Sequence, residues 1–160
     1  MNIRQTRMED LPTLRLIFQN ARRFMAEHGN PTQWGNAAPD ESLVLEDIRL
    51  GHSWVCEEDG HLYATFALVP GEDPTYAVIR GAWKNDRPYA TLHRIASTGE
   101  RSGMMDEIVR FAFARYPNLR GDTHHDNLPM QKAFERNGFE ECGVIWVKDG
   151  TPRIAYCKEK

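Results

Sequence analysis

One stretch of the sequence, residues 89–139, restricts the fold more than any other. It alternates two apolar, strand-like runs with two segments of helical spacing, in the order strand, helix, strand, helix. A strand–helix–strand unit crosses over right-handedly and places its two strands parallel in one sheet. Most other strand-like runs are joined by short turns such as Glu58-Asp59-Gly60, which favour antiparallel pairing. We therefore predict an α/β (α+β) fold with a mixed, mostly antiparallel central sheet, a parallel β-α-β core and helices on both faces.

Hydrophobic periodicity predicts the individual elements. Apolar residues recur every three or four positions after Asp10, which predicts a helix with Pro12 in its first turn and an end at Gly29. Its predicted core face is Leu11, Leu14, Phe18, Ala21 and Met25. Further helices are expected at 43–50, 102–115 and 127–138, and strands at 3–7, 52–57, 61–69, 90–96, 119–124, 141–147 and 152–157. Residues 76–84 fit a strand and irregular structure equally well.

Composition narrows the class of protein. The 160 residues, 41% hydrophobic and 27% charged, predict one soluble globular domain spanning 1–160. A net charge of −3 gives no global basic field, so we expect no nucleic-acid partner. No apolar run approaches the ~20 residues of a membrane span and no signal-peptide core is seen, so we expect no membrane contact and a cytoplasmic location. Three cysteines, Cys56, Cys142 and Cys157, have apolar surroundings and are predicted to be reduced core residues.

A glycine-bearing turn, residues 97–103, joins the strand at 90–96 to the following helix. The free N–H groups of a first helical turn and the helix dipole both favour an anion there. Gly103 allows close approach of a ligand to the backbone, and Arg101 adds a cation. The pattern fits a phosphate-bearing cofactor and an ordinary strand-to-helix turn equally well.

The segment Asp122-Thr123-His124-His125-Asp126-Asn127-Leu128-Pro129-Met130-Gln131-Lys132-Ala133-Phe134-Glu135-Arg136-Asn137-Gly138-Phe139 resembles the GNAT superfamily of N-acetyltransferases. The order of elements, the loop after residues 93–96 and the start of the chain are similar to that family too. The resemblance spans essentially the whole chain and is strongest to bacterial members without an assigned substrate. It implies an acetyl-CoA-dependent N-acetyltransferase that moves an acetyl group to a primary amine of a small molecule, an amino acid or a peptide. The alternative is a non-catalytic acyl-CoA-binding or sensor domain with the same fold.

The resemblance also implies where acetyl-CoA would bind, namely a splay between the strands at 92–96 and 119–124. Main chain near residues 95–97 would pair with the pantetheine arm, and backbone of the loop would hold the pyrophosphate. The residues implied to contact the cosubstrate are Ile95, Ala96, Ser97, Arg101, Ser102, Gly103, Met104, Met105, Asn127 and Phe134. Lys132 and Arg136 fit a contact with its ribose phosphate or a solvated helix face.

Three residues depart from the family pattern. Glu100 is acidic at the first position of the loop and would repel the diphosphate unless its side chain turns away. Met105, at the last position, would crowd the diphosphate. Phe134 stands where many members carry a Tyr that protonates the departing thiolate, and Phe cannot donate a proton. Chemistry here would use another acid, such as water, or none; this departure also supports the sensor alternative.

Acetyl transfer to an amine needs a group that removes the amine proton. His93, Asp122 and His124 are the candidate catalytic bases, and Asp122 and His124 should share a strand face with Arg120 because alternate strand residues point the same way. By the same rule, His93 and Ile95 should share a face. Structural roles for the histidines, and a capping or ion-pair role for the aspartate, stay open.

Trp34 and Tyr76 are the candidate residues for the acceptor amine. A Trp in a polar loop either covers the core edge or lines a ligand cleft. The run from Asp122 to Asp126 contains metal-ligating side chains, but its spacing matches no established pattern, and we expect no metal. The expected partner is a small-molecule or peptide amine, and a homodimer is an open assembly.

Overall fold

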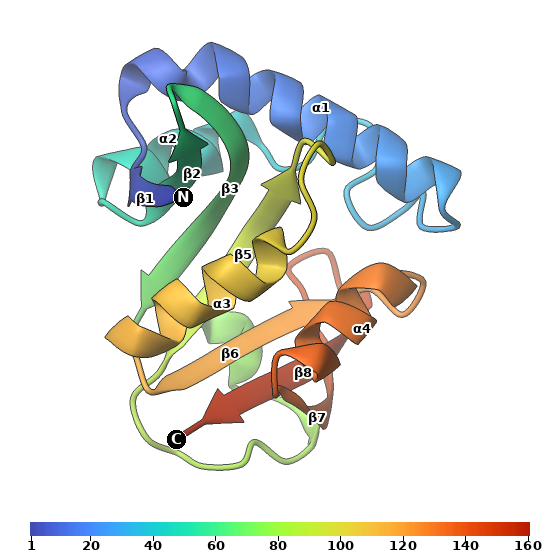
Figure 1. The fold of residues 1–160 in the computed structure, drawn as a ribbon. Coiled ribbons are helices and arrows are strands. Elements are labelled where there is room, and N and C mark those ends of the chain that lie inside the picture. Colours follow the sequence, from blue (N-terminus) through green and yellow to red (C-terminus); the bar gives the residue numbers. More distant parts are fainter. The chain divides into compact units, whose positions relative to one another are not determined.

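The computed structural model describes residues 1–160 and confirms a mixed α/β fold (Figure 1). The helices are α1 (Leu11–Glu27), α2 (Glu41–Arg49), α3 (Met104–Arg115) and α4 (Leu128–Arg136), with 3₁₀ turns η1 (Met8–Asp10) and η2 (Pro74–Tyr76). The strands are β1 (Asn2–Gln5), β2 (Ser53–Glu58), β3 (His61–Pro70), β4 (Arg80–Gly81), β5 (Ala90–Ser97), β6 (Asn118–Thr123), β7 (Glu140–Trp146) and β8 (Pro152–Glu159). No helix combines the length and the apolar character that crossing a membrane requires.

Hydrogen bonds join the strands into one eight-stranded sheet in the order β1-β2-β3-β5-β6-β8-β7-β4. β5 and β6 pair in parallel, with Ala90 opposite Leu119 and Thr91 opposite Arg120. The pairs β1–β2, β2–β3, β6–β8, β7–β8 and β4–β7 are antiparallel. The predicted mostly antiparallel sheet with a parallel β-α-β core is therefore confirmed.

The chain forms two compact units. The first unit comprises residues 1–68 and 93–104, and the second comprises residues 69–92 and 105–160. β5 contributes to both, because its first three residues belong to the second unit and the rest to the first. The single domain expected for residues 1–160 stays a prediction.

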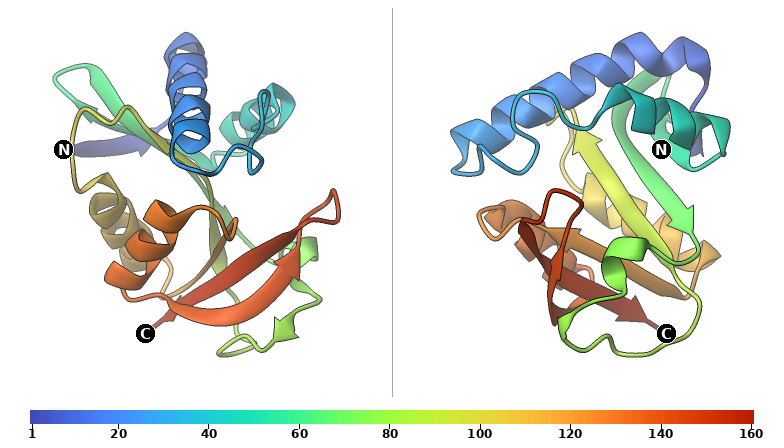
Figure 2. Two further views of the ribbon diagram at one scale, coloured as in Figure 1. Left: turned by 90° about the vertical axis from the view of Figure 1, so that its right-hand side faces the viewer. Right: turned by 180° about the vertical axis from the view of Figure 1, so that it is seen from behind.

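The core of the first unit lies between two helices and the strands β2, β3 and β5. The left view of Figure 2 shows α1 and α2 on the same side of these strands. Buried side chains of both helices meet apolar residues of the strands: Leu11, Leu14, Ile17, Phe18, Val44, Val55, Leu62 and Ala96. The predicted stripe of α1 is thus largely core, whereas Met25 near its end is only half-buried.

A guanidinium ties the N-terminal strand to its neighbours in the first unit. Arg4 of β1 donates to both carboxylate oxygens of Asp10, at 2.9 and 3.0 Å, and to Glu57 of β2 at 2.9 Å. The hydrogen bond from Arg4 is the main reason that the pKa of Asp10 lies below its usual range. This pair therefore makes the first unit sensitive to acid.

The second unit has helices on one side of its strands and the η2 segment on the other (Figure 2). Successive side chains of β8 point to opposite faces of the sheet and pack in different clusters. Tyr156 stacks on Phe134 of α4, with ring centroids 4.8 Å apart. Its neighbours Ala155 and Cys157 belong to a separate apolar cluster with Tyr76. All three cysteines of the chain are buried and unbridged, as the sequence predicted.

Two helix and strand ends differ from the predicted ones for backbone reasons. α3 begins at Met104 and not near residue 102, because Gly103 has φ +78°, a left-handed value that a right-handed helix cannot include. β6 ends at Thr123 and not at His124, because the backbone carbonyl of His124 accepts a turn hydrogen bond from the N–H of Asn127 at 2.9 Å. Residues 76–84, which fitted two alternatives, contain the end of η2 and the two-residue strand β4.

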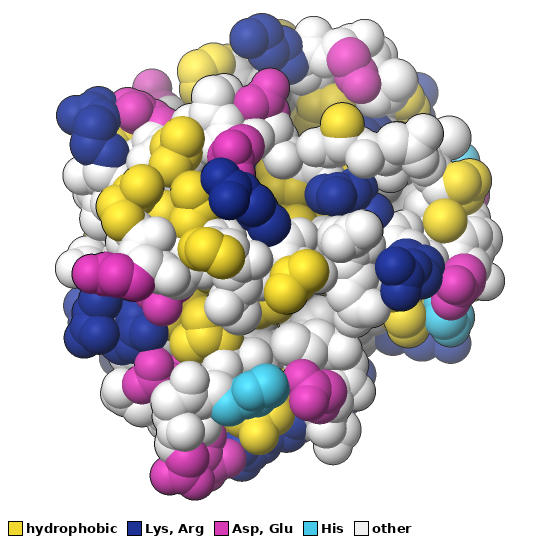
Figure 3. Space-filling view, turned by 90° about the horizontal axis from the view of Figure 1, so that it is seen from above, with side chains coloured by type: hydrophobic (Ala, Val, Ile, Leu, Met, Phe, Trp, Pro, Cys, Tyr) yellow, Lys and Arg dark blue, Asp and Glu magenta, His cyan; other side chains and the backbone are white.

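The exposed hydrophobic side chains of the first unit are dispersed among charged ones. Figure 3 shows hydrophobic side chains at several places between basic and acidic groups. Those of α1 and α2, or directly after α2, are Leu16, Phe24, Leu43, Leu45 and Leu50. Dispersed apolar side chains of this kind are normal on a protein surface. The homodimer stays a prediction.

Candidate functional site

Both charged side chains of the glycine loop pair with residues of β2 and β3. The carboxylate of Glu100 lies 3.0 Å from Nε2 of His61 on β3, and this contact is the main reason that the pKa of Glu100 is lowered. Arg101 pairs with Glu58, and its guanidinium lies 5.7 Å from the ring centroid of Tyr63. Glu100 is thus held by a partner of its own, which removes the main objection to phosphate binding by the loop.

The backbone of the same loop can accept an anion. The N–H groups of Arg101, Ser102 and Gly103 have no acceptor within the protein, and all three residues are exposed. No heavy atom lies within 4 Å of where a Cβ on Gly103 would stand, so the surroundings are open. Met105 is 9% exposed, so its side chain is buried and does not cover the loop. The loop therefore has the donors and the space that phosphate oxygens need.

A sharp change of backbone direction interrupts β5. Arg94 has φ +50°, a left-handed conformation that is uncommon for any residue except Gly. Its guanidinium makes a bidentate pair with Asp47 of α2, with N···O distances of 2.7 and 2.9 Å. Strand alternation requires extended backbone, so it cannot be used to place His93 and Ile95 on one face across Arg94. Residues 93–95 are all half-buried. Sequence reasoning missed Arg94 and Asp47, since nothing local marks either one.

The other predicted residues of the first unit have ordinary structural surroundings. Ala96 belongs to the buried core, whereas His93, Ile95 and Ser97 are half-buried. Trp34 packs edge-on against Phe18, with ring centroids 5.8 Å apart. Trp34 therefore covers the core edge, and its contact with an acceptor stays a prediction.

Two predicted residues of the second unit touch each other directly. The hydroxyl of Tyr76 donates to Oδ2 of Asp122 at 2.6 Å. Tyr76 is 2% exposed, and burial, followed by the charge of Asp122, raises its pKa well above its ordinary value. Tyr76 thus remains a proton donor that orients the carboxylate of Asp122. This places Tyr76 beside a candidate base; its contact with substrate stays a prediction.

A buried cation lies on the same face of β6 as Asp122, as strand alternation predicted. Arg120 is 5% exposed, and its guanidinium carbon lies 4.1 Å and 4.0 Å from the ring centroids of Trp83 and Tyr89. Nη2 donates to the carbonyl of Asn85 at 2.8 Å, and Nε has no partner. The same aromatic rings and Arg120 line a hollow of about 1010 Å³ in the second unit. Cation–π contacts explain how this charge is tolerated without a carboxylate.

His124 lies just beyond β6 in a small polar cluster. Its Nδ1 accepts the backbone N–H of Asp126 at 3.0 Å, and its ring stacks on His125 with centroids 4.3 Å apart. Burial, then the charge of Arg153, lowers the pKa of His124, so its neutral form is favoured. Ligand atoms of His124, His125 and Asp126 lie within 4.8 Å of one another. Because Nδ1 of His124 accepts a hydrogen bond, the neutral ring carries its proton on Nε2, and neither nitrogen offers a ready lone pair to a metal; the absence of a metal stays a prediction.

Asn127 and Phe134 both have clear structural roles in α4. The side chain of Asn127 caps the helix, with Oδ1 accepting the N–H of Met130 at 3.1 Å. Phe134 is 1% exposed, between Tyr156 and Phe139, with ring centroids 4.8 and 4.9 Å away. These contacts are compatible with the cosubstrate roles that the resemblance implied, and those roles stay predictions.

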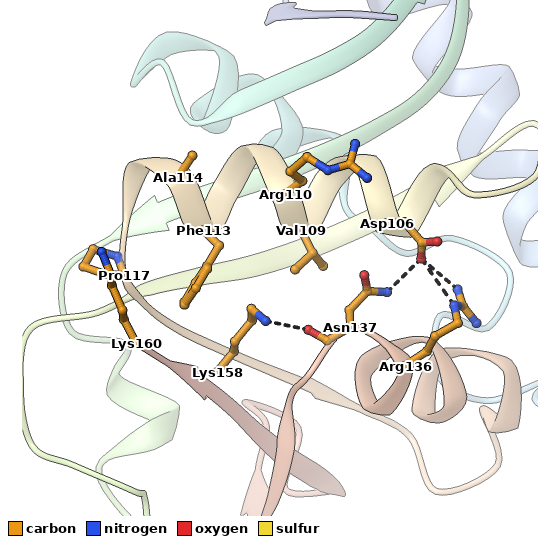
Figure 4. A pocket seen from close by; sticks show the side chains of 10 residues that line it. All are labelled: Asp106, Val109, Arg110, Phe113, Ala114, Pro117, Arg136, Asn137, Lys158 and Lys160. Carbon is orange, nitrogen blue, oxygen red and sulfur yellow. Dashed lines mark hydrogen bonds and ion pairs between the residues drawn. The ribbon is translucent and has the colours of Figure 1, made fainter.

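A basic groove in the second unit runs between α3, α4 and the end of β8 (Figure 4). It has a volume of about 730 Å³, and its lining includes four cationic side chains, Arg110, Arg136, Lys158 and Lys160, but only one carboxylate, that of Asp106. Figure 4 shows Arg136 and Asn137 converging on Asp106, at 3.1 and 3.0 Å. Arg110 pairs with Glu107 at 3.0 Å, so the positive charge left in the groove is that of Lys158 and Lys160, and it favours an anionic ligand.

Solved structures of acetyltransferases share this fold. No protein-family model matches the sequence, and neither does any curated protein. A GNAT-family acetyltransferase from Streptococcus agalactiae matches with a TM-score of 0.91 and 30% identity, over 99% of this chain and 95% of that one. Similar folds are found in a GNAT-family acetyltransferase from Listeria monocytogenes (TM-score 0.74, 20% identity, 99% and 94% covered) and in a ribosomal-protein-alanine N-acetyltransferase from Brucella melitensis (0.65, 19%, 100% and 100%).

Proposed function

Because the chain belongs to the GNAT family of acetyltransferases, we propose that it transfers the acetyl group of acetyl-CoA to a primary amine of a small molecule, an amino acid or a peptide. The observation that carries this proposal is the match over 99% of the chain at 30% identity. The exposed, unpaired N–H groups of residues 101–103 add independent support, because they fit a diphosphate.

One feature of the chain suits the phosphates of CoA. The loop at residues 101–103 offers backbone donors to the diphosphate. Arg136, which the sequence suggested for the ribose phosphate together with Lys132, lines the basic groove of the second unit and pairs there with Asp106. The contact of Lys132 and Arg136 with the ribose phosphate stays a proposal.

A contact of Lys132 and Arg136 with the ribose phosphate predicts discrimination between CoA and 3′-dephospho-CoA. Lys132→Ala and Arg136→Ala should each weaken CoA binding several-fold and leave 3′-dephospho-CoA binding unchanged, because only the former ligand carries the extra phosphate. Arg49→Ala, which removes a similarly exposed arginine from α2, is the matched control. Equal losses for both ligands would place the ribose phosphate elsewhere.

The candidate bases have surroundings that suit proton transfer. Bound acetyl-CoA supplies an activated thioester, whose thiolate, with a thiol pKa of about 8.5, leaves without obligatory protonation. His124 favours its neutral form and would accept an amine proton at Nδ1, in place of the hydrogen bond from Asp126, while Tyr76 keeps Asp122 oriented. Phe134 has no hydroxyl, so we propose that water serves as the acid where one is needed.

The test is turnover with defined acceptors. Purified protein is incubated with acetyl-CoA and a panel of aliphatic amines, free amino acids and peptides with free N-termini, and acetylated products are measured by mass spectrometry together with released CoA. The proposal predicts one CoA released for each acetylated amine. Tight CoA binding with no acetylated product across the panel would favour the non-catalytic acyl-CoA sensor. Absence of both binding and product would contradict the family function altogether.

A further inference from the structure

The backbone of β5 is held in an unfavourable conformation at a single residue. Arg94 lies in the middle of the strand with φ +50°, where an L side chain meets steric strain that Gly does not. Strained backbone of this kind persists only when its surroundings hold it, and it concentrates at functional sites.

The holding contact comes from α2. Both oxygens of Asp47 accept from the Arg94 guanidinium, from Nε at 2.7 Å and from Nη2 at 2.9 Å, which fixes the plane of the guanidinium as well as its position. The side chains are only 20% and 11% exposed, so water screens this pair weakly. By contrast, the Arg49–Glu46 pair on the same helix is 67% and 50% exposed. The buried pair is the stronger constraint.

Asp47 is placed against the local preference of its helix. α2 ends at Arg49, so Asp47 lies in the last turn, where the helix dipole disfavours negative charge. Asp47 also lies at 7% exposure, and a buried carboxylate is costly unless a cation compensates it. The backbone carbonyl of Asp47 accepts the N–H of His52 at 2.8 Å, which anchors this turn to the approach of β2. The position thus demands Arg94 and is rigid enough to hold it.

We propose that Asp47 is a positioning residue for acetyl transfer, which through Arg94 fixes the backbone turn that sets the direction of main chain at residues 95–97. This inference rests on the proposed function, in which that main chain pairs with the pantetheine arm of acetyl-CoA. A left-handed residue redirects the N–H and C=O groups that follow it. Loss of the Asp47 carboxylate should let Arg94 relax to an extended conformation and turn those groups away from the cosubstrate.

The test separates backbone conformation from the salt bridge itself. Asp47→Asn should lower kcat/KM for acetyl-CoA by about tenfold, the size of a left-handed penalty for a residue with Cβ. In that background Arg94→Gly and Arg94→Ala both remove the guanidinium, but only Gly adopts positive φ without strain. We expect Asp47→Asn/Arg94→Gly to recover most of the parental kcat/KM and Asp47→Asn/Arg94→Ala to stay about tenfold lower. Glu46→Gln, which breaks the exposed pair of α2, should leave kcat/KM unchanged.

The outcomes distinguish this inference from the function on which it rests. Rates are compared below the melting temperature of every variant, so a loss of stability alone does not change them. Equal rates for the Gly and Ala double variants would overturn the positioning role while leaving acetyl transfer intact. If the Asp47 variants do not fold, Arg94→Asn and Arg94→Ala provide the same contrast, because Asn tolerates the left-handed conformation better. A parental protein without turnover or CoA binding would instead overturn the proposed function and this inference with it.

Discussion

Gly121 on β6 should be intolerant of even one added methyl group, because of the ring that lies over it. It is the one glycine of the twelve without a positive φ, so its requirement comes from space and not from backbone conformation. A Cβ there would lie 2.8 Å from Cζ and 3.0 Å from Cε1 of Phe134. The ring cannot withdraw, because Tyr156 and Phe139 enclose it and it is 1% exposed.

The magnitude follows from two opposing effects. Overpacking a well-filled core costs about 1–3 kcal/mol, and two contacts at or below 3.0 Å with an enclosed ring place Gly121→Ala in the upper part of that range. Replacing Gly by Ala in a strand returns roughly 0.5–1 kcal/mol through reduced unfolded-state entropy. We therefore expect a net loss of about 1–2 kcal/mol in the free energy of unfolding.

Urea unfolding followed by far-UV circular dichroism measures this loss, and a double-mutant cycle assigns it. Phe134→Leu removes the ring atoms that approach Gly121. In that background Gly121→Ala should be neutral or slightly stabilising, giving a coupling free energy of about 1–2 kcal/mol between the two sites. An equal loss in both backgrounds would refute the packing argument.

Three further predictions concern single side chains. Asn127→Ala should lower the free energy of unfolding by about 1 kcal/mol through the lost cap, as measured by urea unfolding; lower CoA affinity would show an additional ligand contact, and unchanged affinity would limit Asn127 to the cap. Because Arg4 lowers the pKa of Asp10, their ion pair stabilises the folded protein at pH values above the unfolded pKa of Asp, about 3.9, and this stabilisation is lost as the pH falls through the folded pKa. Arg4→Gln should therefore flatten the decline of melting temperature below about pH 4, and an unchanged decline would contradict this. With His124 as base and its pKa lowered, kcat/KM should rise with a midpoint below about pH 6.5, and His124→Ala should remove that rise; a rate that instead climbs towards the amine pKa of about 10 would indicate water as the base.

Elements with a local signal were predictable from sequence. The three- and four-residue spacing from Leu11 to Phe18 gave α1, which the structure places at Leu11–Glu27. Asp59 and Gly60, with φ of +51° and +79°, form the turn that joins β2 to β3. Both predictions depend on neighbours in the chain, where residue preferences act directly. The α/β class followed from the order of these elements.

The site was less predictable, because its contacts join distant residues. Tyr76 and Asp122 are 46 residues apart, and Asp47 and Arg94 are 47 apart. Neither pair has a sequence signal, because its two members are far apart in the chain and nothing local marks either one. Strand alternation is no guide at His93 and Ile95 for the same reason: a partner on α2 stabilises a left-handed conformation of Arg94 that its own preference disfavours. Their common face stays a prediction. Tertiary contacts decide such features.

Calorimetric titration of acetyl-CoA into the purified protein tests the central claim most directly. The account predicts saturable binding of one acetyl-CoA per chain and a raised melting temperature, because the ligand binds the native state alone. Gly103→Asp should weaken this binding, since its carboxylate would stand in the open space where phosphate oxygens approach. No heat and no thermal shift of the parental protein at millimolar acetyl-CoA would contradict the account.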